Sequence, residues 1–445
     1  PSTSTQGLIW LRGDGCRNAI DTNSSTDWKL GWRKLGGSFF CEPIHIEDGV
    51  DVVPMISPGP EALVQLIDWL DGATTSIDVQ MYELMSVHIA QALLRAERRG
   101  VNVTLLLEDS PLDETADLEM MHGYAQFLSE SGVDVRLIGS NDENNAQSPY
   151  RYLHAKIAVR DGSSIWIGSG NWKDSSFPIG EAQGNRERGV FVHHSQFATE
   201  VLERMKQDAN VSLPHIRKWS EHDDSFKVVE GWAMPNVDPL PLGQSLSLPP
   251  TIRVEDAKLF TCPDECVKGI VELIEEAEYS LDLSVQSLSR KWEDEWGVNP
   301  IIEAIELAAE RGVRVRLLHN GYYLNDDVRA IIQLFNNEWN ETRGHDTSAI
   351  LMNVDSSIQK LHDKTLLIDG EVTVLGSLNF APSAFLRNRE HMVVLKSDEL
   401  TEWLERSFED DWHRFDNLTD TDGDGLTDGW EEENGFNRFR GNDTE

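Results

Sequence analysis

The sequence has few basic residues and no long run of apolar residues, and each shortage excludes a class of protein. Its 445 residues include 39 Lys and Arg against 77 Asp and Glu, which gives a formal net charge of −38. That charge argues against a protein that coats nucleic acid, because such binding depends on Lys and Arg that displace counterions. No apolar run approaches the ~20 residues that a membrane-spanning helix needs. The apolar content of 39% and the 14 Trp exclude a wholly disordered chain.

Cysteine is also scarce, with four residues in the whole chain. An even number permits two disulfides in an oxidising compartment. Proximity in the sequence favours Cys16 with Cys41 and Cys262 with Cys266, and four buried thiols are the alternative. A zinc site is disfavoured, since no second close pair of Cys or His has ligand spacing. The chain begins with Pro-Ser-Thr and carries no signal peptide, so we expect a processed or excised piece.

The sequence carries one plan of helices and strands twice. Residues 60–107 predict a helix, a strand, a helix and a strand, because apolar residues recur at helical spacing and then in alternation. Residues 263–317 repeat that order, and in both halves the second helix ends at an Arg-Gly pair. Such repeated units predict an α/β fold with sheets packed between helices.

Two sets of polar residues follow these units at nearly the same spacing. The first set is His154, Lys156, Asp161, Ser169, Asn171, Asn185, Arg186 and Glu187. The second set is His362, Lys364, Asp369, Ser377, Asn379, Asn388, Arg389 and Glu390. A single His-x-Lys-x4-Asp match favours a structural His, whereas two matches with the same residues behind them indicate a functional site.

The residue types in these sets suit an anionic substrate. A His and a Lys two apart on a predicted strand project from the same face. The ammonium group can bind phosphate oxygens while the imidazole attacks or transfers protons. Ser and Asn side chains add neutral donors, and Glu187 and Glu390 can accept from the far ring nitrogen of a His.

The duplicated motifs resemble the signature of the phospholipase D superfamily over about residues 50–415. The resemblance implies two α/β/α sandwich halves related by a pseudo-twofold axis, which bring both motifs to one cleft. It also implies a monomer with both motifs in one chain and no cofactor for catalysis. The small N-terminal β-rich segment and the C-terminal tail lie outside the resemblance.

The resemblance further implies a role for each motif residue. His154 would attack phosphorus to form a phosphohistidine, and His362 would act as the general acid; the reverse assignment is the alternative. The other implied roles are phosphoryl binding by Lys156, Lys364, Asn171 and Asn379, support of that binding by Ser169 and Ser377, imidazole orientation by Glu187 and Glu390, and a more structural part for the motif residues Asp161 and Asp369.

The remaining sequence divides the chain further. We expect an N-terminal segment at 1–42 that resembles the end of a β domain, a first half at 43–231, a Pro-rich linker at 232–252, a second half at 253–416 and an acidic tail at 417–445. The polar stretches 140–149 and 337–348 precede the His motifs and predict rim loops.

The acidic tail contains DTDGDGLTDGWEE at 420–432, which resembles an EF-hand loop or a thrombospondin type 3 calcium repeat. Its candidate Ca²⁺ ligands are Asp420, Asp422, Asp424, Asp428 and Glu431. Thr427 stands where EF-hands usually carry an apolar residue, which favours the extracellular repeat. We expect a structural Ca²⁺ site, with a solvated acidic tail as the alternative.

Glycosylation sequons such as those at Asn102 and Asn340, the tail and the charge favour an exported protein, either extracellular or on the cell surface. Its expected function is that of a phospholipase D-type phosphodiesterase or phosphatidyltransferase on phospholipid, with peripheral membrane contact, similar to cardiolipin-synthase-like members. A nuclease of the same superfamily is the alternative, because Arg186, Arg188, Arg387 and Arg389 could line a local anionic groove. A non-catalytic, calcium-dependent surface scaffold is a second alternative.

Overall fold

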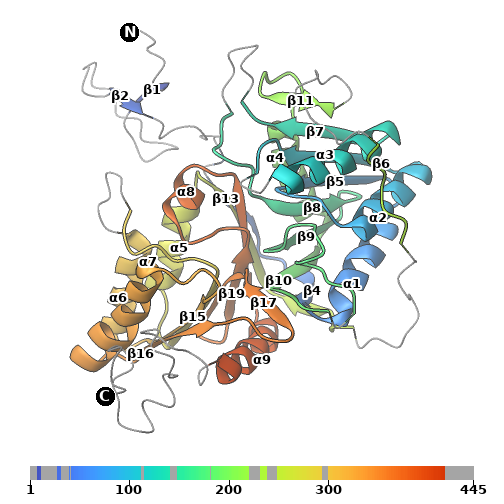
Figure 1. The fold of residues 1–445 in the computed structure, drawn as a ribbon. Helices are drawn as coiled ribbons and strands as arrows, with labels where there is room; N and C mark the ends of the chain where they lie inside the picture. The colour runs from blue at the N-terminus through green and yellow to red at the C-terminus, as the bar shows by residue number, and fades with distance from the viewer. Residues whose placement is uncertain are drawn as a thin grey trace.

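The fold is seen in a computed structural model, which describes residues 8–11, 28–31, 40, 42–111, 115–140, 148–180, 182–219, 231–237, 248–292 and 299–415 (Figure 1). In the N-terminal segment, strands β1 (Leu8–Leu11) and β2 (Trp28–Gly31) pair antiparallel. The predicted Cys16–Cys41 disulfide and all five predicted Ca²⁺ ligands lie outside the described residues.

The first half forms a twisted mixed sheet with helices on both faces. Its strands are β4 (Val50–Ser57), β5 (Ser76–Met81), β6 (Asn102–Glu108), β7 (Asp134–Ile138), β8 (Lys156–Arg160), β9 (Ser164–Gly168), β10 (Gly184–His193), β11 (Ile216–Lys218) and β12 (Ile252–Val254). They are ordered β11-β7-β6-β5-β8-β9-β10-β4-β12, and β17 of the second half also pairs with β10. The helices are α1 (Pro60–Asp71), α2 (Val87–Arg98), α3 (Thr115–Glu130) and α4 (Ser195–Asp208).

The second half repeats this arrangement. Its strands are β3 (Ile44–Ile46), β13 (Asp256–Cys262), β14 (Ser280–Val285), β15 (Arg314–Asn320), β16 (Thr347–Met352), β17 (Ile358–Leu361), β18 (Lys364–Ile368), β19 (Val372–Gly376) and β20 (Glu390–Lys396). The main sheet is ordered β16-β15-β14-β18-β19-β20-β13-β3. The helices are α5 (Cys266–Glu275), α6 (Pro300–Glu310), α7 (Asp326–Gln333), the π-helix η4 (Leu334–Thr342), α8 (Pro382–Leu386) and α9 (Asp398–Phe415).

Each half is an α/β/α sandwich, which confirms the predicted fold class. Helices α1, α2 and α3 cover the outer face of the first sheet, and α5, α6 and α7 cover the outer face of the second (Figure 1). The inner faces of both sheets share one apolar core with α4 and α9, since Val190 and Val393 belong to the same cluster. Burial of this shared core holds the two motif-bearing sheets in a fixed relation.

Two edge strands pair across the expected boundary between the halves. Strand β3 lies in the expected first half but pairs with β13 of the second sheet. Strand β12, which starts inside the expected linker, pairs with β4 of the first sheet. Each sheet therefore takes an edge strand from beyond its own half, because unpaired edge groups favour any strand within reach.

The expected rim loop at 337–348 is also wrong. That segment continues α7 as η4 and then enters β16, with Trp339 fully buried in the outer core of the second half. Its Asn340 makes a packing contact, since Asn340 Nδ2 donates to the Thr347 carbonyl at 2.8 Å; just before the segment, the buried Asn336 Nδ2 donates to the Ala349 carbonyl at 2.8 Å. Of the other expected loop, residues 141–147 lie outside the described part of the chain.

The predicted disulfide between Cys262 and Cys266 is confirmed, with 5.3 Å between the Cα atoms. It joins the last residue of β13 to the first residue of α5. Among the described helices, none combines the length and the apolar content that crossing a bilayer requires.

Candidate active site

Each motif His lies just ahead of a strand rather than within it. The sequence predicted His154 and Lys156 on one strand face, whereas β8 begins at Lys156, and β18 likewise begins after His362. The backbone of the opposite half fixes both positions. The His154 N–H donates to the Arg389 carbonyl at 3.0 Å, and the His362 N–H donates to the Arg186 carbonyl at 3.0 Å. The two motifs thus meet where the halves join.

Each imidazole is held by a Glu from the other half. His154 Nδ1 lies 2.9 Å from Glu390 Oε2, and His362 Nδ1 lies 2.9 Å from Glu187 Oε2. Both Glu side chains are fully buried. A carboxylate at Nδ1 places the proton there and leaves Nε2 with its lone pair for chemistry. Both Glu residues therefore make the hydrogen bonds that the predicted orienting role requires, and each of these bonds crosses between the halves.

The two motif Ser residues donate hydrogen bonds to these carboxylates. Ser169 Oγ donates to Glu187 Oε2 at 2.6 Å, and Ser377 Oγ donates to Glu390 Oε2 at 2.6 Å. Ser176 adds a bond to Glu187 Oε1 at 2.7 Å. The predicted support of the phosphoryl group by Ser stays a prediction. These hydroxyls hold the Glu that holds the His.

Lys156 and Lys364 are fully buried in the same site. Each ammonium group donates to the carbonyl of the His two residues earlier. Lys156 Nζ also lies 5.1 Å from the ring centre of Tyr82, whereas Lys364 Nζ donates to Gln286 Oε1 at 2.8 Å. Burial lowers the pKa of both ammonium groups to about 7. A bound anion would raise both values, so the pair is suited to an anionic phosphoryl group.

Burial also lowers the pKa of both motif His residues. For His154 this effect is opposed by the negative charge of Glu390. The pKa of His362 falls well below its usual value, because burial is reinforced by the positive charges of Lys364 and Lys360. Both rings are therefore neutral in the free protein near pH 7, and His362 is the harder of the two to protonate.

Asn171 and Asn379 lie just behind the Ser positions, in unlike surroundings. Asn171 Nδ2 donates to the buried Glu83, and the Glu83 carboxylate lies 3.1 Å from Lys173 Nζ. The Oδ1 atoms of both Asn are buried without a hydrogen-bond partner in the described part of the chain. Phosphoryl binding by these amides stays a prediction, and at Asn171 one N–H is already used by Glu83.

Asp161 and Asp369 lie at the far ends of β8 and β18 from the His residues. Asp161 accepts hydrogen bonds from the backbone of residues 74–76, and Asp369 from the backbone of residues 278–280. Both residues have positive φ, 53° and 56°, in the turn after their strand. Both Asp residues therefore anchor the turns that lead into β5 and β14, in keeping with the more structural part that the resemblance implies for them.

The Arg residues near the motifs form ion pairs between the halves. The pairs are Arg186 with Asp411 (2.8 Å), Arg389 with Asp208 (2.8 Å) and Arg188 with Asp363. Both partners are almost fully enclosed in each pair, so their charges are compensated inside the protein. The prediction that Arg186, Arg188 and Arg389 line an anionic groove is therefore wrong.

Three site residues escaped the sequence analysis: Tyr82, Gln286 and Lys360. Tyr82 and Gln286 occupy the same repeat position, directly after β5 and β14. The Tyr82 ring centre lies 4.9 Å from that of His154. A residue-by-residue alignment of the two halves would have shown that this position differs between them, although the motifs are the same.

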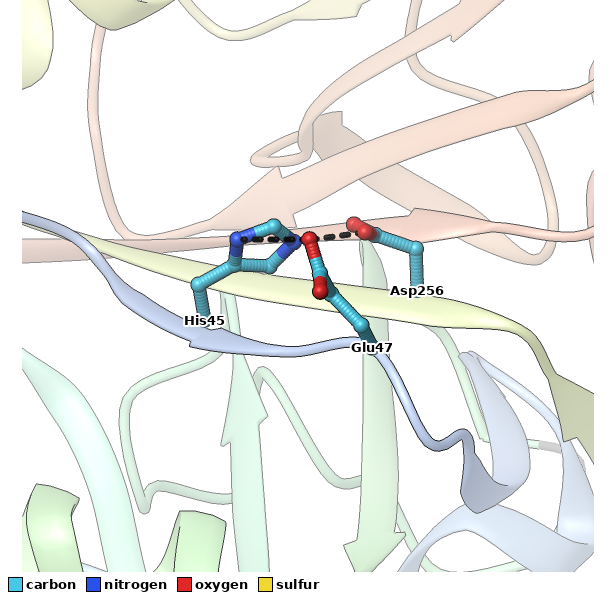
Figure 2. Close-up of side chains that lie close together, drawn as sticks. All are labelled: His45, Glu47 and Asp256. Carbon is cyan, nitrogen blue, oxygen red and sulfur yellow. Dashed lines mark hydrogen bonds and ion pairs between the residues drawn. The ribbon is translucent and has the colours of Figure 1, made fainter.

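One group of His and carboxylate side chains comes within ligand distance in the described part of the chain: His45, Glu47 and Asp256 (Figure 2). His45 Nε2 lies 2.5 Å from Asp256 Oδ2, and His45 Nδ1 lies 3.8 Å from Glu47 Oε1. The short contact joins strand β3 to β13, so a hydrogen bond between paired strands accounts for it. Both ring nitrogens face carboxylates, which favours an ion pair over a metal centre.

Comparison with known proteins agrees with this geometry. The family model described as "Cardiolipin synthase, PLD-like domain" matches residues 66–209 and 270–412, one match in each half. A phospholipase D of Rickettsia typhi is 26% identical over 172 residues, which span 38% of this chain and 75% of that protein. The human mitochondrial cardiolipin hydrolase is 24% identical over 176 residues, 37% of this chain and 62% of that protein.

A solved structure shows the same architecture over both halves. The phosphatidylserine synthase of Haemophilus influenzae superimposes with a TM-score of 0.56 and 12% sequence identity. The superposition covers 83% of this chain and 88% of that one. At this identity the likeness shows a shared fold.

Proposed function

Because the chain belongs to the phospholipase D-like family and is a phosphodiesterase or phosphatidyltransferase of that kind, we propose that it acts on phospholipids through a phosphohistidine. The observation that carries the proposal is the pair of His–Glu hydrogen bonds that cross between the halves, with two buried Lys beside them. This arrangement supplies two imidazoles with free Nε2 atoms and two cations for one phosphoryl group.

The proposed reaction uses two displacements at phosphorus. In the first, His154 Nε2 forms the P–N bond, the P–O bond to the leaving alcohol breaks, and His362 gives its Nε2 proton to that oxygen. In the second, His362 takes a proton from water or an acceptor alcohol, whose oxygen attacks phosphorus and releases His154. Glu390 and Glu187 stabilise whichever imidazole carries the positive charge.

The negative charge of the bound substrate allows His362 to act as the general acid. In the free protein, burial and nearby Lys residues keep His362 neutral. A phosphodiester anion between Lys156 and Lys364 offsets those positive charges and raises the pKa of His362, so its protonated form becomes available when substrate is bound. Lys360 acts in the opposite direction and favours His362 as the neutral nucleophile, which makes the reverse assignment the arrangement to test against.

Trapping the covalent adduct decides between these assignments. A single turnover with phosphorus-labelled phospholipid is quenched with alkali, where phosphohistidine survives, and the labelled peptide is mapped. Label on the peptide that contains His154 supports the proposed roles. Label on the peptide that contains His362 reverses them, and no label in a protein that turns over contradicts the covalent route.

Two observations support phospholipid over nucleic acid as the substrate. The similar proteins include phospholipases D and mitochondrial cardiolipin hydrolases. The Arg residues on which the nuclease alternative depended are enclosed in ion pairs. In one competition with EDTA present, vesicles and a single-stranded oligonucleotide are offered at equal phosphodiester concentration, with His154→Ala as the control. Head-group release without DNA cleavage, lost in the variant, is expected; DNA cleavage alone would overturn the proposed substrate.

We also propose a structural Ca²⁺ site at residues 420–431 and an extracellular or cell-surface location. The support for both is the sequence pattern of the tail and the net charge of −38. Because EDTA is present in the competition, turnover there would separate this Ca²⁺ from the phosphoryl chemistry.

A further inference from the structure

Three loops from both halves meet at the catalytic edge of the sheets. Parallel strands β14, β15 and β16 all end at the edge where Lys364 begins β18. The loops after β15 and β16 are joined there, because the Gly321 N–H donates to the Met352 carbonyl at 2.9 Å. The loop between β9 and β10 joins them from the first half, through the Gly184 N–H and the Ser357 carbonyl at 3.1 Å.

These loops expose four large apolar side chains, which we call the catalytic rim: Ile179, Tyr322, Tyr323 and Val354. Their exposed fractions are 50%, 47%, 54% and 52%. The rings of Tyr322 and Tyr323 meet edge to face with 4.7 Å between their centres. Such exposure gathered around a reaction site marks an interaction surface, whereas single exposed apolar residues elsewhere do not.

One cation lies beside the rim, and another lies beside the first motif. Lys360 Nζ is 5.6 Å from the ring centre of Tyr323, and its charge acts on His362. On the first-half side, the exposed Arg151 lies 5.5 Å from the ring centre of Tyr152, just ahead of His154. In a chain of net charge −38, these two cations favour the approach of an anionic surface to this part of the molecule.

We propose that the catalytic rim docks on a phospholipid bilayer that contains anionic lipids, with the two Tyr rings at the head-group level and Ile179 and Val354 in contact with acyl chains. The inference rests on the proposed function and adds the surface that presents the lipid to the site. Tyr is suited to a membrane interface because one end of its side chain is apolar and the other is polar. Anionic head groups attract the Lys and Arg beside it.

Single-stranded nucleic acid is the other polymer that aromatic and basic side chains bind. Two features favour the bilayer. Ile179 and Val354 cannot stack on bases, and Tyr322 and Tyr323 pack edge to face on each other, so the two rings do not form a shared stacking platform. The negative charge of the rest of the chain also opposes a long polyanion that extends beyond the mouth.

The test compares the full chain with the double variant Tyr322→Ser, Val354→Ser and with the control Tyr279→Ser. Tyr323 stays in place, because its ring lies beside Lys360. Tyr279 is 72% exposed and lies at the start of β14, the end opposite the site. Each protein is sedimented with vesicles of phosphatidylcholine and phosphatidylglycerol in equal parts, then assayed on those vesicles and on the soluble diester bis(p-nitrophenyl) phosphate.

The double variant is expected to bind vesicles on the order of tenfold more weakly, as loss of this much apolar contact implies. Its turnover of vesicle lipid falls in proportion through the apparent KM, while its rate on the soluble diester matches that of Tyr279→Ser. Vesicle binding equal to that of the control overturns the docking surface, and so does an equal loss on both substrates. Weakened binding to an oligonucleotide with vesicle binding intact overturns it in favour of nucleic acid.

The outcome also separates docking from the proposed function. Vesicle binding that depends on the rim, without any lipid turnover by the unmodified chain, supports docking and contradicts the proposed substrate. Lipid turnover that is indifferent to the rim supports the substrate and contradicts docking.

Discussion

The two halves carry the same motifs but line the site with different neighbours. After β5 the first half places Tyr82, whose ring lies beside both His154 and Lys156. After β14 the second half places Gln286, which accepts a hydrogen bond from Lys364. One Lys therefore faces a ring and the other an amide. Identical motifs can take unlike chemical roles, because the residues around them set the protonation of each His.

The halves also differ where each sheet packs on its inner helix. In the second half, Arg316 lies 2.7 Å from both Asp282 and Glu409 and stacks on Phe408 and Trp412. The same repeat positions in the first half hold Thr104, Met205 and Ala209, and they line a cavity of about 310 Å³. Smaller side chains at these positions leave a cavity in the first half, whereas larger side chains fill the same place in the second half.

The largest expected effect tests whether the two His residues are unlike. His154→Ala and His362→Ala should each lower phospholipid turnover by about a thousandfold or more, since each removes a reacting group. With a p-nitrophenyl leaving group, which needs no acid, His362→Ala should still release one equivalent of nitrophenol in a burst, and His154→Ala should not. Bursts of equal size in both variants would contradict the assigned roles.

The next effect concerns the ion pair that joins Arg188 to Asp363. In the repeat, His391 is equivalent to Arg188 and Ala155 is equivalent to Asp363, so this ion pair has no symmetric copy. Arg188→Ala should lower the free energy of unfolding by about 3–5 kcal/mol, because it leaves the buried Asp363 carboxylate without the cation paired with it. Replacing both partners by apolar residues of similar volume should cost less than the single change. Urea unfolding measures the free energy of unfolding of the unmodified chain and of both variants. A smaller loss in Arg188→Ala than in the double replacement would contradict this prediction.

A third prediction uses His319, whose repeat counterpart is Leu107. His319 Nε2 accepts from the Leu288 N–H at 3.2 Å, and burial lowers its pKa to about 4. Between about pH 6.5 and 4, His319 binds a proton in the unfolded chain but not in the folded chain. Its contribution to stability is therefore complete above about pH 6.5 and falls as the pH drops towards 4. This residue should account for a loss of about 3 kcal/mol across that range.

His319→Leu provides the comparison. At pH 7 it should cost about 1–2 kcal/mol, because the Leu288 N–H loses its acceptor. Between pH 6.5 and 4 its unfolding free energy should fall less steeply than that of the unmodified chain. Other buried His residues keep part of the slope, so the expected outcome is a flatter curve, and parallel curves would contradict the assignment.

The smallest effect comes from the unequal packing of the two inner helices. Arg316→Ala should lower the unfolding free energy by about 1–2 kcal/mol, because Asp282 loses its nearer cation and keeps only Arg314 at 3.5 Å. Thr104→Ala, at the same position in the first half, should change it by less than about 0.5 kcal/mol, since Thr104 lines an existing cavity. Equal losses would show that the cavity does not loosen the first half.

The sequence was sufficient for the features that depend on period and repetition. The helix at 60–71, the strand at 76–81 and their copies follow from apolar spacing, and the motif residues follow from duplication. The pairing of His154 with Glu390 could not be derived, because it depends on how the halves pack across the shared core. Burial was equally hidden: Arg188 looked like a groove residue until its partner on the other half enclosed it.

The crossing His–Glu bonds have a consequence for assembly. A first half produced alone would carry His154 without the carboxylate of Glu390, so two separately expressed halves should regain activity only when mixed, and at a rate that depends on the concentration of both. The covalent connection turns that second-order encounter into a first-order docking step and fixes the yield at one working centre per polypeptide at any dilution.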